Sequence, residues 1–373
     1  MSDDRIKAIL PQNAAFIPDY RHFASVMRNE RPARLPLYEH FVNTPVMEKV
    51  LGVTFSAFDD GTPSGIREFF RHYCRFYREL TYDVVSYEMC IGGFLPGGNA
   101  ICGGMGPVQS RKDFEQYPWD SVVERFWAYA RPRFDALAEV MPEGMKAVGG
   151  VGNGAFELAE SLVGLQYLPF MEVDDPDLYA SLFRKIGDLM ISIWHEFLRR
   201  YSSTFAACRF GDDLGYKASL LTNPGTVHNH IFPQYKRVID AVHAAGNRFL
   251  WHSCGNILSI MDDAIRLGID GKHSNEDTIA PFSEWIERYG NRIALVGGFD
   301  LNFLCNNSSA EITAGVVELG TKYRSMANGY ALGSGNSIPE YVPVENYLAM
   351  IEGCVRIRAM EASGIEGLGG ARW

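Results

Sequence analysis

The chain has 373 residues, of which 47% are hydrophobic and 21% are charged. This balance supports a large apolar core and excludes an intrinsically disordered protein. The formal net charge of −10 argues against nucleic-acid binding, which needs a dense Lys and Arg surface, so we expect small molecules or another protein as partners.

The start of the chain predicts no export signal, because residues 1–10 lack a basic region followed by an apolar stretch. No apolar run in the sequence approaches the ~20 residues that cross a bilayer. We therefore expect a cytoplasmic protein without membrane contact, and we leave self-association into a homo-oligomer open. Residues 1–34 form an N-terminal extension with a helical pattern over 19–29, which we expect to cap one end of the fold.

Eight short runs rich in β-branched or aromatic residues follow, and each precedes a segment that can form a helix. In chain order these predicted strands are residues 35–40, 82–88, 145–154, 205–213, 247–255, 268–274, 292–300 and 329–336. Strict alternation of strands and helices implies a parallel sheet, and eight units favour closure into a (β/α)8 TIM barrel. We expect one domain over residues 1–373, with an open doubly wound sheet as the alternative and residues 91–144 covering the end opposite the extension.

Polar side chains lie at nearly every predicted strand end, where the active site of a parallel barrel is found. They are Glu39, His40, Glu88, Asn153, Glu157, Asp212, Asp213, His252, Cys254, His273, Asp300, Ser334 and Asn336. We expect one subset of these residues to bind substrate: Asn153, His273, Asp300, Ser334 and Asn336.

Three carboxylates at these strand ends are candidates for catalysis, namely Glu88, Asp212 and Asp213. A carboxylate at this place can exchange protons with a substrate or orient it. Adjacent carboxylates usually point apart, so only one of Asp212 and Asp213 needs to face the substrate. The alternative is that the pair caps a helix or turn beside Gly215, where Asp is favoured.

His252 and Cys254 form the sharpest local signal. Residues two apart in an extended segment point to the same side, so the imidazole and the thiolate can bind one metal ion. Nitrogen and sulfur donors favour Zn2+. Sequence spacing leaves open both a third ligand and the alternative of a core thiol beside a hydrogen-bonded histidine. The candidates for a third ligand are His273, Asp300, Cys305 and Glu340.

The glycine-rich run 148–154 is only loosely similar to a phosphate-binding loop. It has neither the lysine of a P-loop nor the spacing of a dinucleotide-binding motif. Close packing of the backbone is therefore the favoured explanation of these glycines.

Several segments together resemble the uroporphyrinogen decarboxylase superfamily. The strongest matches are residues 251–257, 297–300 and 330–352, and the resemblance extends to 31–40, 156–164 and 212–246. The resemblance implies a (β/α)8 fold, in agreement with the count of strands. It also implies one of two activities, either decarboxylation in the haem pathway or transfer of methyl groups between cobalamin and thiols such as coenzyme M.

Two positions separate these branches. The decarboxylase carries an arginine-rich segment at its first strand end and a histidine at its last strand, whereas this chain has no arginine in 38–43 and has Ser334 at the second place. The methyltransferase branch binds zinc through a His-x-Cys pair, which His252 and Cys254 match, and through a distant cysteine, whose place is also taken by Ser334. Because Ser334 replaces this cysteine, the chain either uses a different third zinc ligand or binds no metal.

The resemblance therefore implies a zinc-dependent, corrinoid-linked methyltransferase that works between a small molecule and cobalamin held by a partner corrinoid protein. One alternative is uroporphyrinogen decarboxylation, for which Arg209 and Lys217 are the nearest basic residues. The other is a barrel that binds a corrinoid or another ligand without catalysis, as the loss of a reactive side chain at Ser334 suggests.

Overall fold

The computed structural model describes residues 16–364. Contacts within the chain divide it into two compact units, each assembled from separate stretches of sequence. The first unit comprises Met1–Ser86, Ala136–Ala147 and Asp270–Trp373, and the second comprises Tyr87–Asp135 and Val148–Ile269. Among residues 16–364, no helix has the length and apolar character needed to cross a bilayer. The prediction made for residues 1–10 lies outside the described residues.

Seven parallel strands are present in the described part of the chain. They are β1 (Val84–Cys90), β2 (Lys146–Gly152), β3 (Phe205–Gly211), β4 (Phe249–His252), β5 (Gly271–His273), β6 (Ala294–Phe299) and β7 (Tyr330–Ser334). Each overlaps one of the predicted strands. β1 and β2 begin in the first unit and continue in the second, β3 and β4 lie in the second, and β5 to β7 lie in the first.

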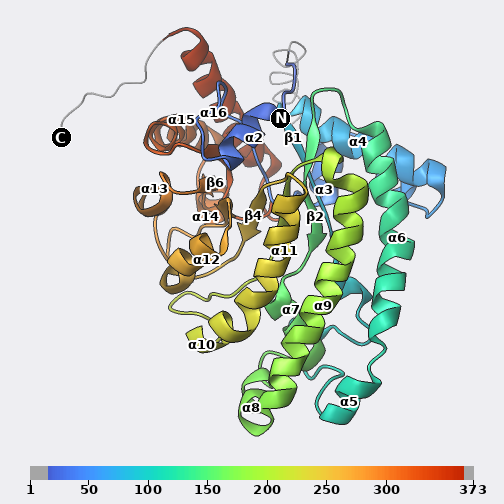
Figure 1. The fold of residues 1–373 in the computed structure, drawn as a ribbon. Coiled ribbons are helices and arrows are strands. Elements are labelled where there is room, and N and C mark those ends of the chain that lie inside the picture. The colour runs from blue at the N-terminus through green and yellow to red at the C-terminus, as the bar shows by residue number, and fades with distance from the viewer. Residues whose placement is uncertain (1–15, 365–373) are drawn as a thin grey trace. The chain divides into compact units, whose positions relative to one another are not determined.

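Helices separate successive strands along the chain (Figure 1). Those of the first unit are α2 (Arg21–Met27), α3 (Thr44–Leu51), η1 (Ser56–Phe58), α4 (Pro63–Glu79), α13 (Phe282–Tyr289), α14 (Leu301–Asn306), α15 (Ser309–Met326) and α16 (Val344–Ala362). Those of the second unit are η2 (Ile91–Phe94), η3 (Ala100–Cys102), α5 (Arg111–Gln116), α7 (Ala155–Val163), α8 (Leu168–Asp174), α9 (Pro176–Tyr201), η4 (Ser202–Thr204), α10 (Pro224–Thr226), η5 (Val227–Ile231), α11 (Phe232–Ala244), η6 (Leu258–Ile260) and α12 (Met261–Leu267). The segment 91–144 also contains α6 (Trp119–Val140), and its expected place over one end of the fold stays a prediction.

The second unit is organised around the parallel pair β3 and β4. Their register places Cys208 beside Phe249 and Gly211 beside His252. Helices α9 and α11 pack against each other, as Figure 1 shows. The side chain of Asp175 accepts a hydrogen bond from the Leu178 N–H at 3.0 Å and so caps the start of α9.

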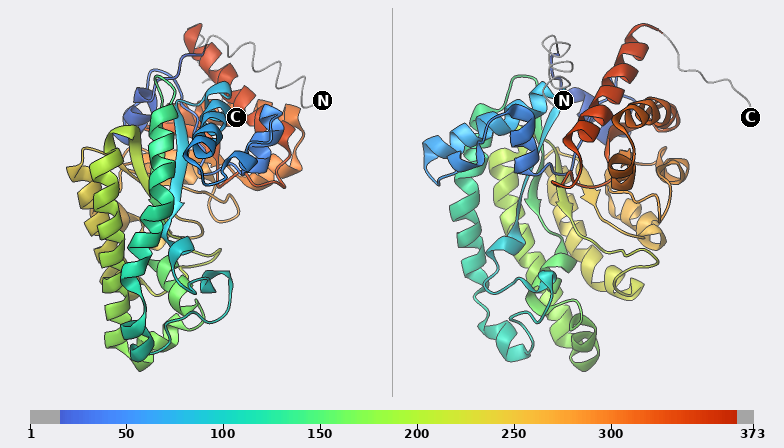
Figure 2. Two further views of the ribbon diagram at one scale, coloured as in Figure 1. Left: turned by 90° about the vertical axis from the view of Figure 1, so that its right-hand side faces the viewer. Right: turned by 180° about the vertical axis from the view of Figure 1, so that it is seen from behind.

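The first unit contains the parallel series β5, β6 and β7. A short extended segment joins β7 through a parallel bridge from Leu37 to Leu332, and a second parallel bridge links Val42 to Ile338, beyond the end of β7. The sequence predicts a full strand here, but the described pairing is limited to these bridges. Pro36 has no N–H to donate to a ladder, which shortens the pairing. Helices α15 and α16 pack together and are seen from two further directions in Figure 2.

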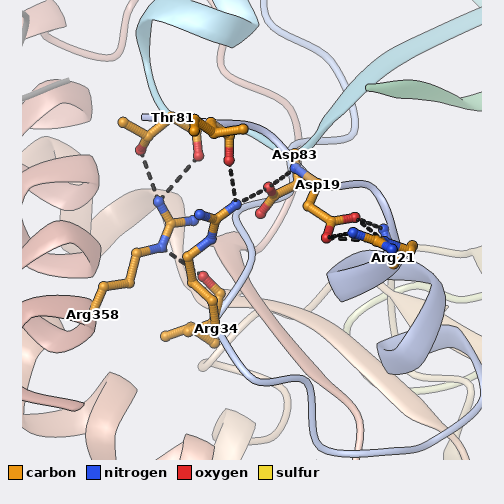
Figure 3. A network of polar contacts seen from close by, with 8 residues as sticks. Asp19, Arg21, Arg34, Thr81, Asp83 and Arg358 are labelled. Carbon is orange, nitrogen blue, oxygen red and sulfur yellow. Dashed lines mark hydrogen bonds and ion pairs between the residues drawn. The ribbon is translucent and has the colours of Figure 1, made fainter. Parts of the chain in front are cut away.

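A polar network ties the start of the described chain to its last helix in the first unit (Figure 3). The fully buried side chain of Asp83 forms an ion pair with Arg34 and accepts the Asp19 N–H at 2.8 Å. Arg358 of α16 donates to the carbonyl and the hydroxyl of Thr81 at 3.1 and 3.0 Å. Within residues 16–34, the predicted extension therefore contains the helix α2. Asp19 before this helix and Arg34 after it both contact the Asp83 side chain and so anchor the extension.

The glycine-rich run of β2 packs closely, as its sequence predicts. Gly149 has φ +133°, and a Cβ at this position would lie 2.1 Å from the Tyr87 carbonyl oxygen. A larger residue would collide with the neighbouring backbone, so this position needs glycine for close approach.

Candidate functional site

The strand register of the second unit brings Asp213 and Cys254 to equivalent places. Gly211 pairs with His252, and Asp213 and Cys254 each lie two residues further along their chains. The Asp212 N–H also donates to the His252 carbonyl at 3.0 Å, which continues the pairing past the end of β3. The exits of two neighbouring parallel strands therefore present their side chains side by side.

Three potential metal donors meet at this point. The Nε2 atom of His252 lies 3.5 Å from the Sγ atom of Cys254 and 4.0 Å from Oδ1 of Asp213. The Cys254 N–H donates to the same Asp213 oxygen at 2.8 Å, and the three donor atoms all lie within 4.8 Å of one another. His252 is buried, Cys254 is half-buried and the Asp213 side chain is 43% exposed. Solvent therefore reaches this cluster of three donors on the side where Asp213 lies.

The donor set and its spacing fit a zinc ion. Tetrahedral zinc with ordinary bond lengths separates a nitrogen and a sulfur ligand by about 3.6 Å and a nitrogen and an oxygen ligand by about 3.3 Å. The His252 to Cys254 distance of 3.5 Å already matches, and the 4.0 Å distance to Asp213 needs a small movement of an exposed carboxylate. One nitrogen, one sulfur and one oxygen ligand leave a fourth position for a substrate.

Asp213 is a third donor that the second unit itself supplies, although the sequence analysis assigned it to catalysis. The four residues proposed there as third ligands all belong to the first unit: His273, Asp300, Cys305 and Glu340. Their participation stays a prediction. The equal offsets of Asp213 and Cys254 from their strand ends appear only in the structure, because both residues fall inside the strands predicted from the sequence, 205–213 and 247–255.

Asp212 occupies a different environment from Asp213. Its buried carboxylate accepts hydrogen bonds from the N–H groups of Phe156 at 2.9 Å and Glu157 at 2.7 Å, and from the Tyr235 hydroxyl. Burial raises the pKa of Asp212 to about 7, although these hydrogen bonds oppose the shift. The carboxylate caps the first turn of α7, which is a different place from the helix or turn beside Gly215 expected as the alternative, and its catalytic role stays a prediction.

Glu157 links Asn153 to the metal-donor cluster. The Asn153 side chain donates to Glu157 at 2.8 Å and accepts the Gly92 N–H at 2.9 Å, while Glu157 accepts the Asp213 N–H at 3.3 Å. Asn153 has φ +69°, a conformation that Asn tolerates better than most residues. Burial raises the pKa of Glu157 well above its usual range, and the nearby carboxylates of Asp212 and Asp213 add to the shift.

Glu88 and Arg209 form an ion pair in the interior of the second unit. Their side chains are 3% and 0% exposed, and Arg209 Nε lies 2.8 Å from Glu88 Oε2. Cys90 approaches the other carboxylate oxygen at 3.7 Å. The negative charge of Glu88, a predicted catalytic residue, is therefore balanced by Arg209. Arg209 is also one of the two basic residues named above for the decarboxylase alternative.

In the first unit, Ser334 is paired with the buried carboxyl group of Glu39. One Glu39 oxygen accepts the Ser334 N–H at 3.1 Å, and the other forms a short hydrogen bond with the Ser334 hydroxyl. That hydroxyl also lies 2.6 Å from the Asn336 carbonyl oxygen. Burial raises the pKa of Glu39 to about 8, opposed by the bonds from Ser334. A protonated Glu39 carboxyl group can donate to the Ser334 hydroxyl, which then donates to the Asn336 carbonyl oxygen. Each of these three groups then has a hydrogen-bond partner.

His273 lies beside this pair. Its Nε2 atom is 3.1 Å from the Ser334 carbonyl oxygen, and its ring stacks on that of His40 with the centroids 5.6 Å apart. The structure thus brings two of the predicted substrate-binding residues, His273 and Ser334, together within the first unit.

Asp300, another predicted substrate-binding residue, performs a local structural task. It caps α14 by accepting the Asn302 N–H at 2.6 Å, and its second oxygen accepts the Asp277 N–H at 2.7 Å. The substrate-binding roles of Asp300, Asn153 and Asn336 stay predictions.

Comparisons with known proteins agree with this architecture. A model of the family described as uroporphyrinogen decarboxylase (URO-D) matches residues 105–356. Among solved structures, a methyltransferase from Methanosarcina mazei is similar with a TM-score of 0.65 and 15% sequence identity, over 91% of this chain and 99% of its own. Xylanase B from Clostridium stercorarium F9 gives a TM-score of 0.40 and 9% identity, over 74% and 91% of the two chains. A search of curated proteins finds no match. The similarity to the Methanosarcina structure confirms the α/β fold class of the barrel type.

Proposed function

Because the chain belongs to the uroporphyrinogen decarboxylase family, we propose that it is a zinc-dependent methyltransferase that moves methyl groups between a small molecule and a corrinoid carrier. The observation that carries this proposal is the meeting of His252, Cys254 and Asp213 within 4.8 Å. The similar Methanosarcina mazei structure, itself described as a methyltransferase, supports the same branch.

Each of the three donors would supply a different type of ligand to the ion. His252 supplies a buried imidazole, Cys254 supplies a thiolate, and Asp213 supplies a carboxylate whose exposure leaves room for a substrate beside it. When bound at such an open site, zinc lowers the pKa of a thiol or alcohol ligand and so makes it a better nucleophile. The Cys254 N–H fixes the orientation of the Asp213 carboxylate through its 2.8 Å hydrogen bond.

The surrounding residues position these donors. Glu157 holds the backbone of Asp213 and is itself held by Asn153, as residues behind metal ligands commonly are. Asp212 fixes the start of α7. Glu88 is paired with Arg209, and a catalytic role for it stays a prediction.

The cobalt that gives or takes the methyl group would be brought by a partner corrinoid protein. Free methylcobalamin can replace that partner in a first assay. We expect the zinc-loaded chain to consume methylcobalamin in the presence of a thiol such as coenzyme M, followed by the change in the visible spectrum of the corrinoid. Chelation should abolish turnover and added Zn2+ should restore it.

Two variants sharpen this assay. Asp213→Ala removes a proposed ligand and should abolish turnover, whereas Cys102→Ala, which removes an exposed thiol outside the donor cluster, should leave turnover unchanged. Turnover of uroporphyrinogen without metal would contradict the proposal and favour decarboxylation. Tight cobalamin binding without transfer to any thiol would favour a binding protein instead.

A further inference from the structure

A second candidate site lies on the second unit, between α11 and α12. It is a surface cavity of about 400 Å³, lined by side chains from the segment that starts at His228 and from α12. The cavity opens widely to solvent, so a bound molecule would keep much of its own surface exposed. The apolar part of its lining comes from Phe232, Pro233 and Leu267.

The histidine of this cavity is positively charged on hydrogen-bonding grounds. His228 Nδ1 lies 2.6 Å from the Pro224 carbonyl oxygen, and Nε2 lies 2.8 Å from a carboxylate oxygen of Asp263. Both partners are acceptors, so both ring nitrogens must carry a proton. The pKa of His228 is accordingly raised, above all by the hydrogen bond to Asp263.

Two further cations complete the polar part of the lining. Lys236 and Arg266 have side chains that are 49% and 68% exposed. Arg266 shares Asp263 with His228, and Lys236 pairs with Asp240. Three positive groups thus meet two carboxylates, which leaves a local surplus of one positive charge on a chain whose formal net charge is −10.

The backbone at this place is unusual. Val227–Ile231 form a π-helical turn that leads directly into α11. Such turns are rare and occur frequently at functional sites. Asn223 anchors the segment by accepting the Thr226 N–H at 2.8 Å.

We propose that this cavity binds a small organic anion, whose carboxylate or phosphate contacts Lys236 and Arg266 while its apolar group packs on Phe232 and Leu267. Apolar contact and charge are both required, since an exposed pair of cations alone binds ions weakly. The proposal is independent of the metal cluster and of the methyltransferase assignment.

Calorimetric titration of the full chain with matched probes tests this inference. Benzoate and phenyl phosphate carry both features, acetate and inorganic phosphate carry only the charge, and benzyl alcohol carries only the ring. We expect one of the first two probes to bind at least about tenfold more tightly than the other three. The better of benzoate and phenyl phosphate identifies the head group. Equal binding of inorganic phosphate or acetate would mean an adventitious anion only and would overturn the proposal, as would no binding of either aromatic anion below roughly 5 mM.

A pair of double variants locates the binding. Lys236→Ala with Arg266→Ala should weaken the better aromatic anion by about tenfold. The matched control is Arg75→Ala with Arg288→Ala, which removes two exposed arginines that are likewise paired with a carboxylate one turn away on their own helices. This control should leave binding unchanged. Equal weakening by both pairs would show a general charge effect and would contradict the site.

Discussion

The strand ends of the two units use similar polar residues differently. In the second unit, Asp213, His252 and Cys254 direct their donor atoms toward one point, and the Asp213 side chain is 43% exposed. In the first unit, Ser334 is fully buried and its hydroxyl lies between Glu39 and the Asn336 carbonyl. A polar residue at a strand end can therefore bind a ligand or stabilise the fold. Its hydrogen-bond partners and its exposure to solvent distinguish these two roles.

The same contrast applies to the adjacent residues Asp212 and Asp213. Asp212 accepts hydrogen bonds from two N–H groups and one hydroxyl in the interior, whereas Asp213 reaches the surface beside the imidazole and the thiol. We expect substitutions in the donor cluster to change metal binding and substitutions in the first unit to change stability.

The largest effect is expected from Cys254→Ala. Loss of the thiolate should lower the affinity for Zn2+ at least about 100-fold, because removing a direct ligand costs more than disturbing the residues behind it. Competition with a chromophoric chelator measures the affinity. Cys102→Ala, which removes an exposed thiol, is the control and should retain wild-type affinity. Equal losses in both variants would show a general effect of removing a thiol and would contradict the assignment of Cys254 as a ligand.

Ser334→Ala should reduce the free energy of unfolding by about 2 kcal/mol, because it leaves the buried Glu39 carboxyl group and the Asn336 carbonyl without their shared partner. Urea denaturation at pH 7 measures the change. Ser325→Ala removes an exposed hydroxyl that donates to the Lys322 carbonyl and should change stability by less than about 0.5 kcal/mol. Zinc affinity should remain that of the wild type, and a loss comparable to that of Cys254→Ala would show that Ser334 serves the metal.

Glu39→Gln should change how stability depends on pH. The pKa of Glu39 is raised to about 8 in the folded chain, so between roughly pH 4.5 and 8 the folded state keeps a proton that the unfolded state has lost. Stability of the wild type should therefore fall as pH rises through this window, relative to the variant. We expect the difference in the free energy of unfolding between the two proteins to move by about 3.5 kcal/mol in favour of the variant from pH 5 to pH 8.

Denaturation curves of both proteins at the two pH values test this prediction. Glu318→Gln, at an exposed position of α15, is the control and should follow the wild type. A constant difference between Glu39→Gln and the wild type would mean that Glu39 is ionised throughout the window.

The smallest effect is expected from Asp300→Ala, which removes the cap of α14 and should cost about 1 kcal/mol of stability. Asp300→Asn keeps an acceptor oxygen and should recover most of the loss. Neither change should alter zinc content. Release of zinc by Asp300→Ala alone would instead return Asp300 to the metal site as a ligand.

Much of the fold could be predicted from local patterns. Runs of β-branched and aromatic residues located all seven strands, because these residue types favour buried strands and the pattern is visible within a few residues. The shortened pairing around Leu37 and the short helix α14 were missed. The first depends on the missing N–H of Pro36, and the second begins at a single capping residue, Asp300.

The candidate site was only partly predictable. His252 and Cys254 are two residues apart, so the geometry of an extended segment alone places them together. Asp213 lies 41 residues before Cys254, and only the register of β3 on β4 brings it there. The pairing of Glu39 with Ser334 spans 295 residues and likewise depends on tertiary structure. The sequence therefore predicted two of the three proposed zinc ligands, His252 and Cys254, but not the third, Asp213.

Elemental analysis of the gently purified chain, beside His252→Ala prepared in the same way, tests whether the donor cluster holds zinc. We expect about one equivalent of zinc in the wild type and less than about 0.2 equivalents in the variant. Less than about 0.2 equivalents in the wild type, or a zinc content that His252→Ala leaves unchanged, would contradict this expectation.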